Sequence, residues 1–248
     1  MAQILVRNER GVAYVTIANE RKLNTLNSAL MEEFIAAIQG LAADESLRAV
    51  VVTGAAGRAF VGGADIDEMA SLNADSARAF ITLLHRCCDG LRKLPVPVIG
   101  RIQGYALGGG LELAAACDLR VAAETAVFGM PEVKLGIPSV IEAALLPSLV
   151  GWGRTRQILF LGENFTAAEA AQWGLVELVV PAAELDASVE RWIESILQAG
   201  SRAVRLQKQL IRAWEDLPLR EAVAAGIDSF VAAWETEEPR RMMRTFRR

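Results

Sequence analysis

The sequence predicts an α/β fold in which apolar strands and amphipathic helices recur along most of the chain. Short apolar runs are bounded by turn residues, helical periodicity separates them, and 52% of the 248 residues are apolar against 23% charged. Each run is mostly apolar, which is typical of strands covered on both faces. The composition describes a protein with a large core and excludes a disordered chain.

The expected elements follow one another in order. Strands are expected at residues 4–7, 12–17, 49–53, 97–102, 118–122 and 126–129. Ser28 is expected to cap a helix with Leu30, Phe34, Ile38 and Leu41 on one face. A second helix is expected from residue 75 to 94, where two prolines end it, and residues 57–64 are expected to form a glycine-rich loop.

The chain changes character after about Val180. Amphipathic helices are expected at residues 185–197, 204–214 and 219–234, and they carry Trp192, Trp214 and Trp234. We therefore expect a core over residues 1–180 and a helical region over residues 181–248. Such a helical region either closes over the core or forms an oligomer interface.

Charge and cysteine content exclude several classes of protein. A net charge of −4 argues against nucleic-acid or anionic-membrane partners, and no apolar run reaches membrane-spanning length. Cys87, Cys88 and Cys117 form no spaced framework, so reduced thiols in a cytoplasmic protein are expected. The single histidine, His85, is expected to be structural, and neither a zinc motif nor a serine-histidine-aspartate triad is supported.

Two glycine-rich junctions between a strand and a helix form the centre of the expected site. Gly108, Gly109 and Gly110 lie where unpaired N–H groups at a helix start favour an anion, or an oxygen that gains charge during a reaction. Gly62 and Gly63 form a second junction of this kind. Loops after neighbouring parallel strands can each direct one donor at a common oxygen, which is the minimum for stabilising an oxyanion.

Two glutamates accompany these junctions. Glu112 lies just inside the helix after the triple glycine, and Glu132 follows Pro131 at the end of a short strand. Paired acids near apolar walls have their pKa values pushed apart, so that one can accept a proton and the other can donate one. On the alternative interpretation, the glycines only allow tight packing and Glu112 is a favourable acid in the first helical turn.

Three ordered motifs resemble those of the crotonase superfamily, and within it those of enoyl-CoA hydratases. They are Arg58-Ala59-Phe60-x-x-Gly63-Ala64-Asp65-Ile66, Gly104-Tyr105-Ala106-Leu107-Gly108-Gly109-Gly110-x-Glu112-Leu113 and Phe128-Gly129-x-Pro131-Glu132. The resemblance covers nearly the whole chain. It implies a crotonase-like spiral of β-β-α repeats with a C-terminal helical region, in trimers that pair into hexamers.

The resemblance also implies a reaction: addition of water to a trans-2-enoyl-CoA, giving a 3-hydroxyacyl-CoA. The N–H groups of Ala64 and Gly109 would hold the thioester oxygen, Glu112 would assist the attack of water, and Glu132 would protonate Cα. No metal or redox cofactor would be required, because coenzyme A is part of the substrate. The positions expected to contact the acyl-CoA are Lys22, Leu23, Gly62, Gly63, Ala64, Asp65, Ile66, Gly108, Gly109, Gly110, Pro131, Val140 and Ile141.

The chain departs from the family pattern after Glu132. Typical hydratases continue with a P-G-x-G-G stretch and a Gln-Arg-Leu, whereas residues 136–147 here read GIPSVIEAALLP. Val140 and Ile141 in place of glycines would narrow or reshape the acyl pocket. Glu142 is expected to be a surface or capping acid. Asp65 and Asp118 are expected to be structural.

The basic end of the chain allows two interpretations. It forms either a solvated tail or a contact with CoA phosphates, since guanidinium groups suit phosphate and charged tails are common. The residues concerned are Arg240, Arg241, Arg244, Arg247 and Arg248.

Other functions stay open at this point. A Δ3-Δ2 enoyl-CoA isomerase would use the same oxyanion hole, but isomerases commonly keep one catalytic glutamate. Thioester hydrolysis and decarboxylation are further crotonase reactions. A non-catalytic RNA-binding relative is a rival from another class, and both the acidic net charge and the glutamate pair argue against it.

Overall fold

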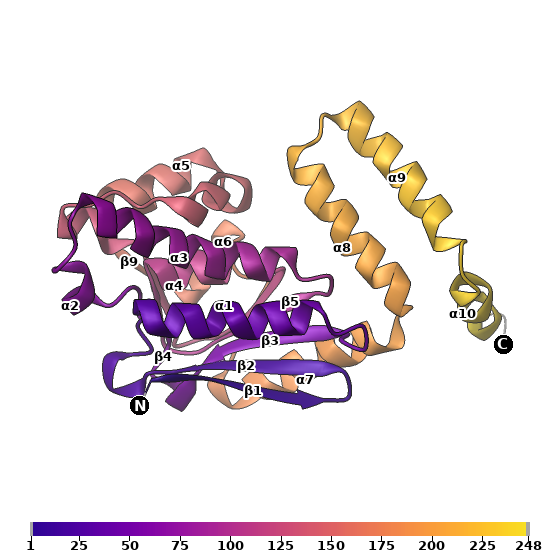
Figure 1. Ribbon diagram of the computed structural model, residues 1–248, viewed down its shortest axis with the longest axis horizontal. Helices are drawn as coiled ribbons and strands as arrows, with labels where there is room; N and C mark the ends of the chain where they lie inside the picture. Colours follow the sequence, from indigo (N-terminus) through magenta and orange to yellow (C-terminus); the bar gives the residue numbers. More distant parts are fainter. Residues whose placement is uncertain (1, 247–248) are drawn as a thin grey trace.

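The computed structural model describes residues 2–246, whose strands form two sheets (Figure 1). The larger sheet has the order β1 (Gln3–Glu9), β2 (Val12–Ala18), β3 (Ala49–Gly54), β5 (Val98–Ile102), β7 (Leu119–Ala123), β10 (Leu178–Val180). The smaller sheet has the order β4 (Ala59–Val61), β6 (Tyr105–Leu107), β8 (Val127–Gly129), β9 (Asn164–Thr166). The β1–β2 and β8–β9 pairs are antiparallel, and the other described pairs are parallel.

From β3 to β8, successive strands alternate between the two sheets, and each pair of strands is followed by helical segments. After β3 and β4 come α2 (Ile66–Met69) and α3 (Ala74–Lys93), and after β5 and β6 comes α4 (Gly109–Ala115). After β7 and β8 come the 3-10 turns η3 (Pro131–Leu135) and η4 (Ile141–Leu145), then α5 (Leu146–Leu161). The expected spiral of β-β-α repeats is therefore confirmed. Because β4, β6 and β8 are parallel, the segments that follow them leave from one edge of the smaller sheet.

Helices cover both faces of the larger sheet, as predicted. On β3, Val50 and Val52 belong to the core cluster shared with α1 (Ser28–Ala42) and α3. The alternate residues Ala49 and Val51 belong to a second cluster with α7 (Leu185–Gln198). Side chains alternate between faces along a strand, so each helix layer receives every second residue.

Two local predictions were wrong. Residues 57–64 contain the strand β4 as well as a loop, because Phe60 and Val61 are fully buried and β4 pairs with β6. The helix α1 is capped by Asn27, whose side chain accepts the N–H of Leu30 at 2.9 Å, and not by Ser28. The N–H of Ser28 instead donates to the Glu68 carboxylate at 2.9 Å, which ties the start of α1 to α2.

The C-terminal helices agree with the predicted spans, and one more follows them. They are α7, α8 (Ser201–Asp216), α9 (Leu219–Ala233) and α10 (Glu238–Phe246). Figure 1 shows α8 and α9 as a helical hairpin that stands away from the two sheets. The remaining elements are η1 (Glu20–Lys22), η2 (Ala55–Gly57), α6 (Ala167–Trp173) and η5 (Ala182–Glu184).

Among the described residues, no helix combines the length and hydropathy needed to cross a bilayer. All three cysteines are buried and free, as expected.

A buried lysine fastens α8 to the core. Nζ of Lys208, which is 6% exposed, donates to the carbonyl oxygens of Leu91 and Val96 and, at 2.6 Å, to Oδ2 of Asp118. The same Asp118 oxygen accepts the N–H of Val98 at 2.7 Å. Burial lowers the pKa of Lys208, and the charge and hydrogen bond of Asp118 oppose that shift.

We predict that Asp118→Ala destabilises the fold by about 3 kcal/mol, because it leaves a buried ammonium without its counter-charge. Lys208→Met is expected to lower the free energy of unfolding by less, because Asp118 is partly exposed and still accepts the hydrogen bond from the N–H of Val98. Urea midpoints at one fixed protein concentration measure both effects. Equal losses of stability in the two variants would contradict the explanation that the unpaired buried ammonium causes the larger loss.

Candidate active site

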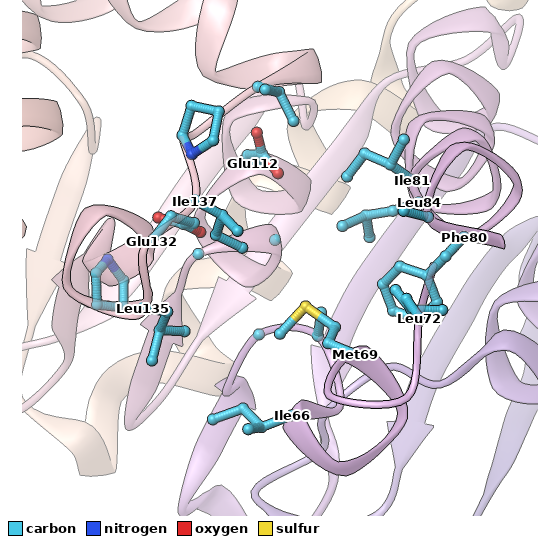
Figure 2. A pocket seen from close by; sticks show the side chains of 18 of the residues that line it. Ile66, Met69, Leu72, Phe80, Ile81, Leu84, Glu112, Glu132, Leu135 and Ile137 are labelled. Carbon is cyan, nitrogen blue, oxygen red and sulfur yellow. The ribbon is translucent and has the colours of Figure 1, made fainter. Parts of the chain in front are cut away.

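A cavity of about 700 Å³ opens at the edge of the smaller sheet, between the segments that follow β4, β6 and β8. Its wall from α2, α3 and the segment between them is mostly apolar (Figure 2), with Asn73 and Arg78 as polar members, and includes Ile66, Met69, Leu72, Phe80, Ile81 and Leu84. The opposite side carries Glu112 and Glu132. The cavity thus combines an apolar wall with a small number of polar groups, as ligand sites do.

The start of α4 packs so closely that side chains are excluded from it. A Cβ on Gly110 would lie 2.0 Å from the carbonyl oxygen of Val61 in β4. A Cβ on Gly108 would lie 2.4 Å from Oε1 of Glu132, and Gly108 also has a φ of +52°, which favours glycine. The triple glycine therefore lets α4 approach both β4 and the Glu132 carboxylate.

Among residues 2–246, the backbone N–H groups of Ala64 and Gly109 make no hydrogen bond, and neither do those of Gly63 and Gly110 beside them. On the other side of each, Asp65 N–H donates to the carbonyl of Leu26, and Gly108 N–H donates to that of Gly129. Both Ala64 and Gly109 line the cavity. The two donors are thus held in place by bonds on adjacent residues and are available to a ligand oxygen.

Glu112 is buried, with 3% of its surface exposed. Its Oε1 accepts the N–H of Ala143 in η4 at 3.0 Å. Burial raises the pKa of Glu112 to about 8; the hydrogen bond from Ala143 opposes this shift, and the charges of Glu132 and Glu142 add to it. A pKa of about 8 favours the protonated form of Glu112 at pH 7.

Glu132 lies at the start of η3 and lines the same cavity. The hydroxyl of Ser139 donates to its Oε2 at 2.9 Å. Burial raises the pKa of Glu132, and the Ser139 hydrogen bond opposes that shift. Two carboxyl groups with raised pKa values thus face one cavity and are able to hold a single proton between them near neutral pH.

The structure brings most of the predicted contact residues to this cavity. Gly62, Gly63, Ala64, Ile66, Gly108, Gly109, Pro131 and Val140 line it together with the two glutamates. Gly110 faces β4 instead. Ile141 lines a neighbouring cavity of about 570 Å³, which shares Val140 with the first, so the expectation that Ile141 faces the main pocket was wrong.

Lys22, Leu23 and Asp65 lie beside the cavity and not on its wall. The carbonyl of Leu23 accepts the N–H of Gly62 at 2.8 Å, which holds the loop against the second glycine junction. Nζ of Lys22 donates to Asp65 and Asp67 at 2.8 Å each. Asp65 also caps α2 by accepting the N–H groups of Asp67 and Glu68, in agreement with its predicted structural role.

The prediction for Glu142 was wrong. This residue is 7% exposed and caps no helix, since its turn η4 has no side-chain cap. Its Oε1 lies 2.9 Å from Nδ1 of His85 on α3, which stays half-exposed and has the predicted satisfied hydrogen bond. The turn η4 places the side chain under α3, where His85 supplies the donor that a buried carboxylate needs.

Three features of the site were not predicted. The apolar wall from α2 and α3 includes Ile81 as well as Phe80 and Leu84, and the helical spacing of these residues could have placed them together. Nothing in the local sequence marks Ser139 or the N–H of Ala143 as partners of the glutamates. Both contacts arise from turns that follow Glu132.

The arginine-rich end lies far from the cavity within one chain, because α10 and α2 are at opposite ends of the molecule (Figure 1). Arg240 pairs with Glu237, and its guanidinium lies 6.0 Å from the ring centre of Trp234. Arg247 and Arg248 lie outside the described residues.

Comparison with known proteins identifies similar chains over almost the full length. Residues 7–247 match the family model described as enoyl-CoA hydratase/isomerase. The short-chain-enoyl-CoA hydratase of Clostridium acetobutylicum is 37% identical over 98% of this chain and 94% of its own length. The crotonyl-CoA hydratase of Syntrophomonas wolfei is 35% identical with the same coverage of both chains.

Solved structures agree with these similarities. The enoyl-CoA hydratase of Bacillus anthracis superposes with a TM-score of 0.95 at 33% identity, covering 99% of this chain and 96% of that one. An enoyl-CoA hydratase of Thermoplasma volcanium gives a TM-score of 0.92 at 28% identity, covering 100% and 98%.

The raised pKa of Glu112 predicts a pH-dependent stability. A carboxyl group with a higher pKa when folded stabilises the protein fully below its unfolded pKa and loses that contribution as pH rises to about 8. We expect Glu112→Gln to gain stability over the wild type as pH rises from about 5 to 8, by up to roughly 1.4 kcal/mol per pH unit. Urea unfolding at several pH values measures the difference, and parallel stability profiles would refute the assignment.

Proposed function

The chain belongs to the enoyl-CoA hydratase/isomerase family, and we propose that it catalyses the reversible addition of water to a trans-2-enoyl-CoA, giving a 3-hydroxyacyl-CoA. One observation carries the proposal: two carboxyl groups and two unbonded N–H groups face a single cavity. Hydration of a conjugated thioester needs these two kinds of group, a donor pair for the carbonyl oxygen and an acid–base pair for the proton transfers.

The N–H groups of Ala64 and Gly109 stabilise the thioester oxygen as it gains negative charge. They are fixed by the bonds of their neighbours, so they need no reorganisation during the reaction. The apolar wall opposite the glutamates excludes water from the acyl group, which strengthens these hydrogen bonds. The same cavity surface suits an acyl chain.

Glu112 and Glu132 hold the attacking water between them. Glu112 takes a proton from the water as its oxygen bonds to Cβ, the C=C electron pair moves towards the thioester oxygen, and Glu132 protonates Cα. The reactive arrangement has one proton on the pair, located on Glu132, and return of a proton from Glu112 to Glu132 restores it. Because burial raises the pKa of Glu112 to about 8, the pair holds one proton near neutral pH, and this proton moves from Glu112 to Glu132 before the attack.

No metal or redox group takes part in this proposal, since coenzyme A belongs to the substrate. We assign the Lys22–Leu23 loop and the Ala64–Ile66 segment to the adenine end of CoA, because hydrogen bonds join them beside the cavity. We also propose a cytoplasmic location, which suits three buried free cysteines.

Hydration of crotonyl-CoA and longer trans-2-enoyl-CoAs, followed by loss of the enoyl thioester absorbance, tests the proposal. We expect rapid hydration by the wild type and at least about a hundredfold lower kcat for both Glu112→Gln and Glu132→Gln. Glu32→Gln, which changes an exposed acid on α1, is the matched control and should leave the rate unchanged. Absence of hydration at every chain length refutes the proposal, and a 3-enoyl-CoA then tests isomerisation.

We further propose that copies of the chain assemble through α9, as a trimer or a pair of trimers. One stripe of this helix is exposed and apolar: Leu219, Val223, Ile227, Phe230 and Val231. Exposed stripes of this size usually mark contact surfaces.

Sedimentation is expected to give a mass well above the 26.8 kDa of one chain. The double substitution Ile227→Asp with Phe230→Asp should dissociate the assembly, whereas Glu221→Gln on the opposite side of α9 should not. A monomeric wild type contradicts this assembly.

A further inference from the structure

The turn η4 is held from two directions by successive residues. The side chain of Glu142 reaches α3, where its Oε1 lies 2.9 Å from Nδ1 of His85. A carboxylate can only accept, so the imidazole is the donor. The N–H of the next residue, Ala143, is shared between the carbonyl oxygen of Val140 within the turn, at 2.9 Å, and Oε1 of Glu112, at 3.0 Å. One short turn therefore joins the histidine on α3 to the carboxyl group in the cavity.

The backbone of this turn is strained. Ile141 has a φ of +41°, and a β-branched residue rarely adopts this left-handed conformation. Strained residues persist only where the surrounding contacts hold them, and they concentrate at functional sites. Ile141 itself packs against the hydrophobic core, and the two residues that follow it, Glu142 and Ala143, make the polar contacts of the turn.

The burial of Glu142 also indicates that this residue holds the turn η4. Its Oε2 is fully buried without a hydrogen-bond partner among the described residues, so the carboxyl group depends on His85 alone. A buried carboxyl group with a single partner is costly, and an apolar residue would fill this place at a lower cost. Packing does not offset this free-energy cost of burying Glu142, and we therefore interpret the residue as one that holds the turn.

We propose that His85 and Glu142 are positioning residues, which clamp η4 onto α3 and thereby hold the Ala143 N–H on the carboxyl group of Glu112. The inference depends on the proposed function for the catalytic meaning of Glu112, although the contacts themselves involve no substrate. His85 and Glu142 do not line the cavity, so they act only through Ala143 and Glu112.

The hydrogen bond that the clamp holds in place and the charge of Glu142 shift the pKa of Glu112 in opposite directions. The Ala143 hydrogen bond lowers the pKa of Glu112, and the negative charge of Glu142 raises it by a smaller amount. The other charged groups acting on Glu142 are Arg92 and Asp89 on α3. The isosteric Glu142→Gln keeps an acceptor for His85 and removes only the charge, whereas Glu142→Ala removes the clamp as well.

These opposite effects define the experiment. Infrared titration of the protonated carboxyl C=O stretch, assigned by its loss in Glu112→Gln, measures the pKa of Glu112 without any substrate. We expect Glu142→Gln to lower this pKa and Glu142→Ala to raise it. His85→Ala should raise it, and His85→Gln, which restores a donor, should return it towards the wild-type value.

Kinetics with crotonyl-CoA provide the second measurement. Glu142→Ala and His85→Ala are expected to lower kcat about tenfold with KM within about twofold of the wild type, because geometry at Glu112 is lost while substrate contacts stay. Glu32→Gln serves as the control for both measurements.

The infrared result separates this inference from the proposed function. Shifts in the same direction for Glu142→Gln and Glu142→Ala, or shifts no larger than that of Glu32→Gln, overturn the clamp. If the wild type hydrates no enoyl-CoA but the opposite shifts are observed, the proposed reaction fails and the clamp stands.

Discussion

The site depends on one close approach between two backbone segments, the start of α4 and the strand β4. The carbonyl oxygen of Val61 occupies the space that a Cβ on Gly110 would need, at 2.0 Å. Two β-β-α repeats can meet at this distance only where there is no side chain. This close approach places Ala64 and Gly109 at the same cavity, and hydrogen bonds on adjacent residues keep their N–H groups fixed.

The same approach determines the electrostatics of the site. Gly108 allows the carboxyl group of Glu132 to lie against the backbone, and α4 carries Glu112 into the apolar interior. Desolvation raises the pKa of both carboxyl groups, and hydrogen bonds to each group limit the rise. The acid–base pair of the proposed reaction thus has pKa values that burial has raised, at the expense of folding stability.

Several of these features could be predicted from the sequence, and their causes are local. Glycines at 62, 63 and 108–110 permit close approach wherever they occur, and the apolar runs at residues 49–53 and 97–102 form buried strands. The spacing of Glu112 and Glu132 from those glycines carries the resemblance to the family. The short strand β4 was not predicted, because three residues among glycines give no periodicity, and only pairing with β6 stabilises them.

The sequence alone determined the α/β layering, the C-terminal helices, the glycine junctions and the two glutamates, because each depends on residue type and on spacing along the chain. The spiral order of the repeats was implied by the resemblance of three motifs to a known family. Only the tertiary structure decided the partners of those glutamates. Ser139 and Ala143 reach them through turns, and Glu142 is buried beneath α3 instead of lying on the surface. Such contacts depend on where a turn folds back in space, and the identity of a serine, an alanine or a glutamate does not encode that position.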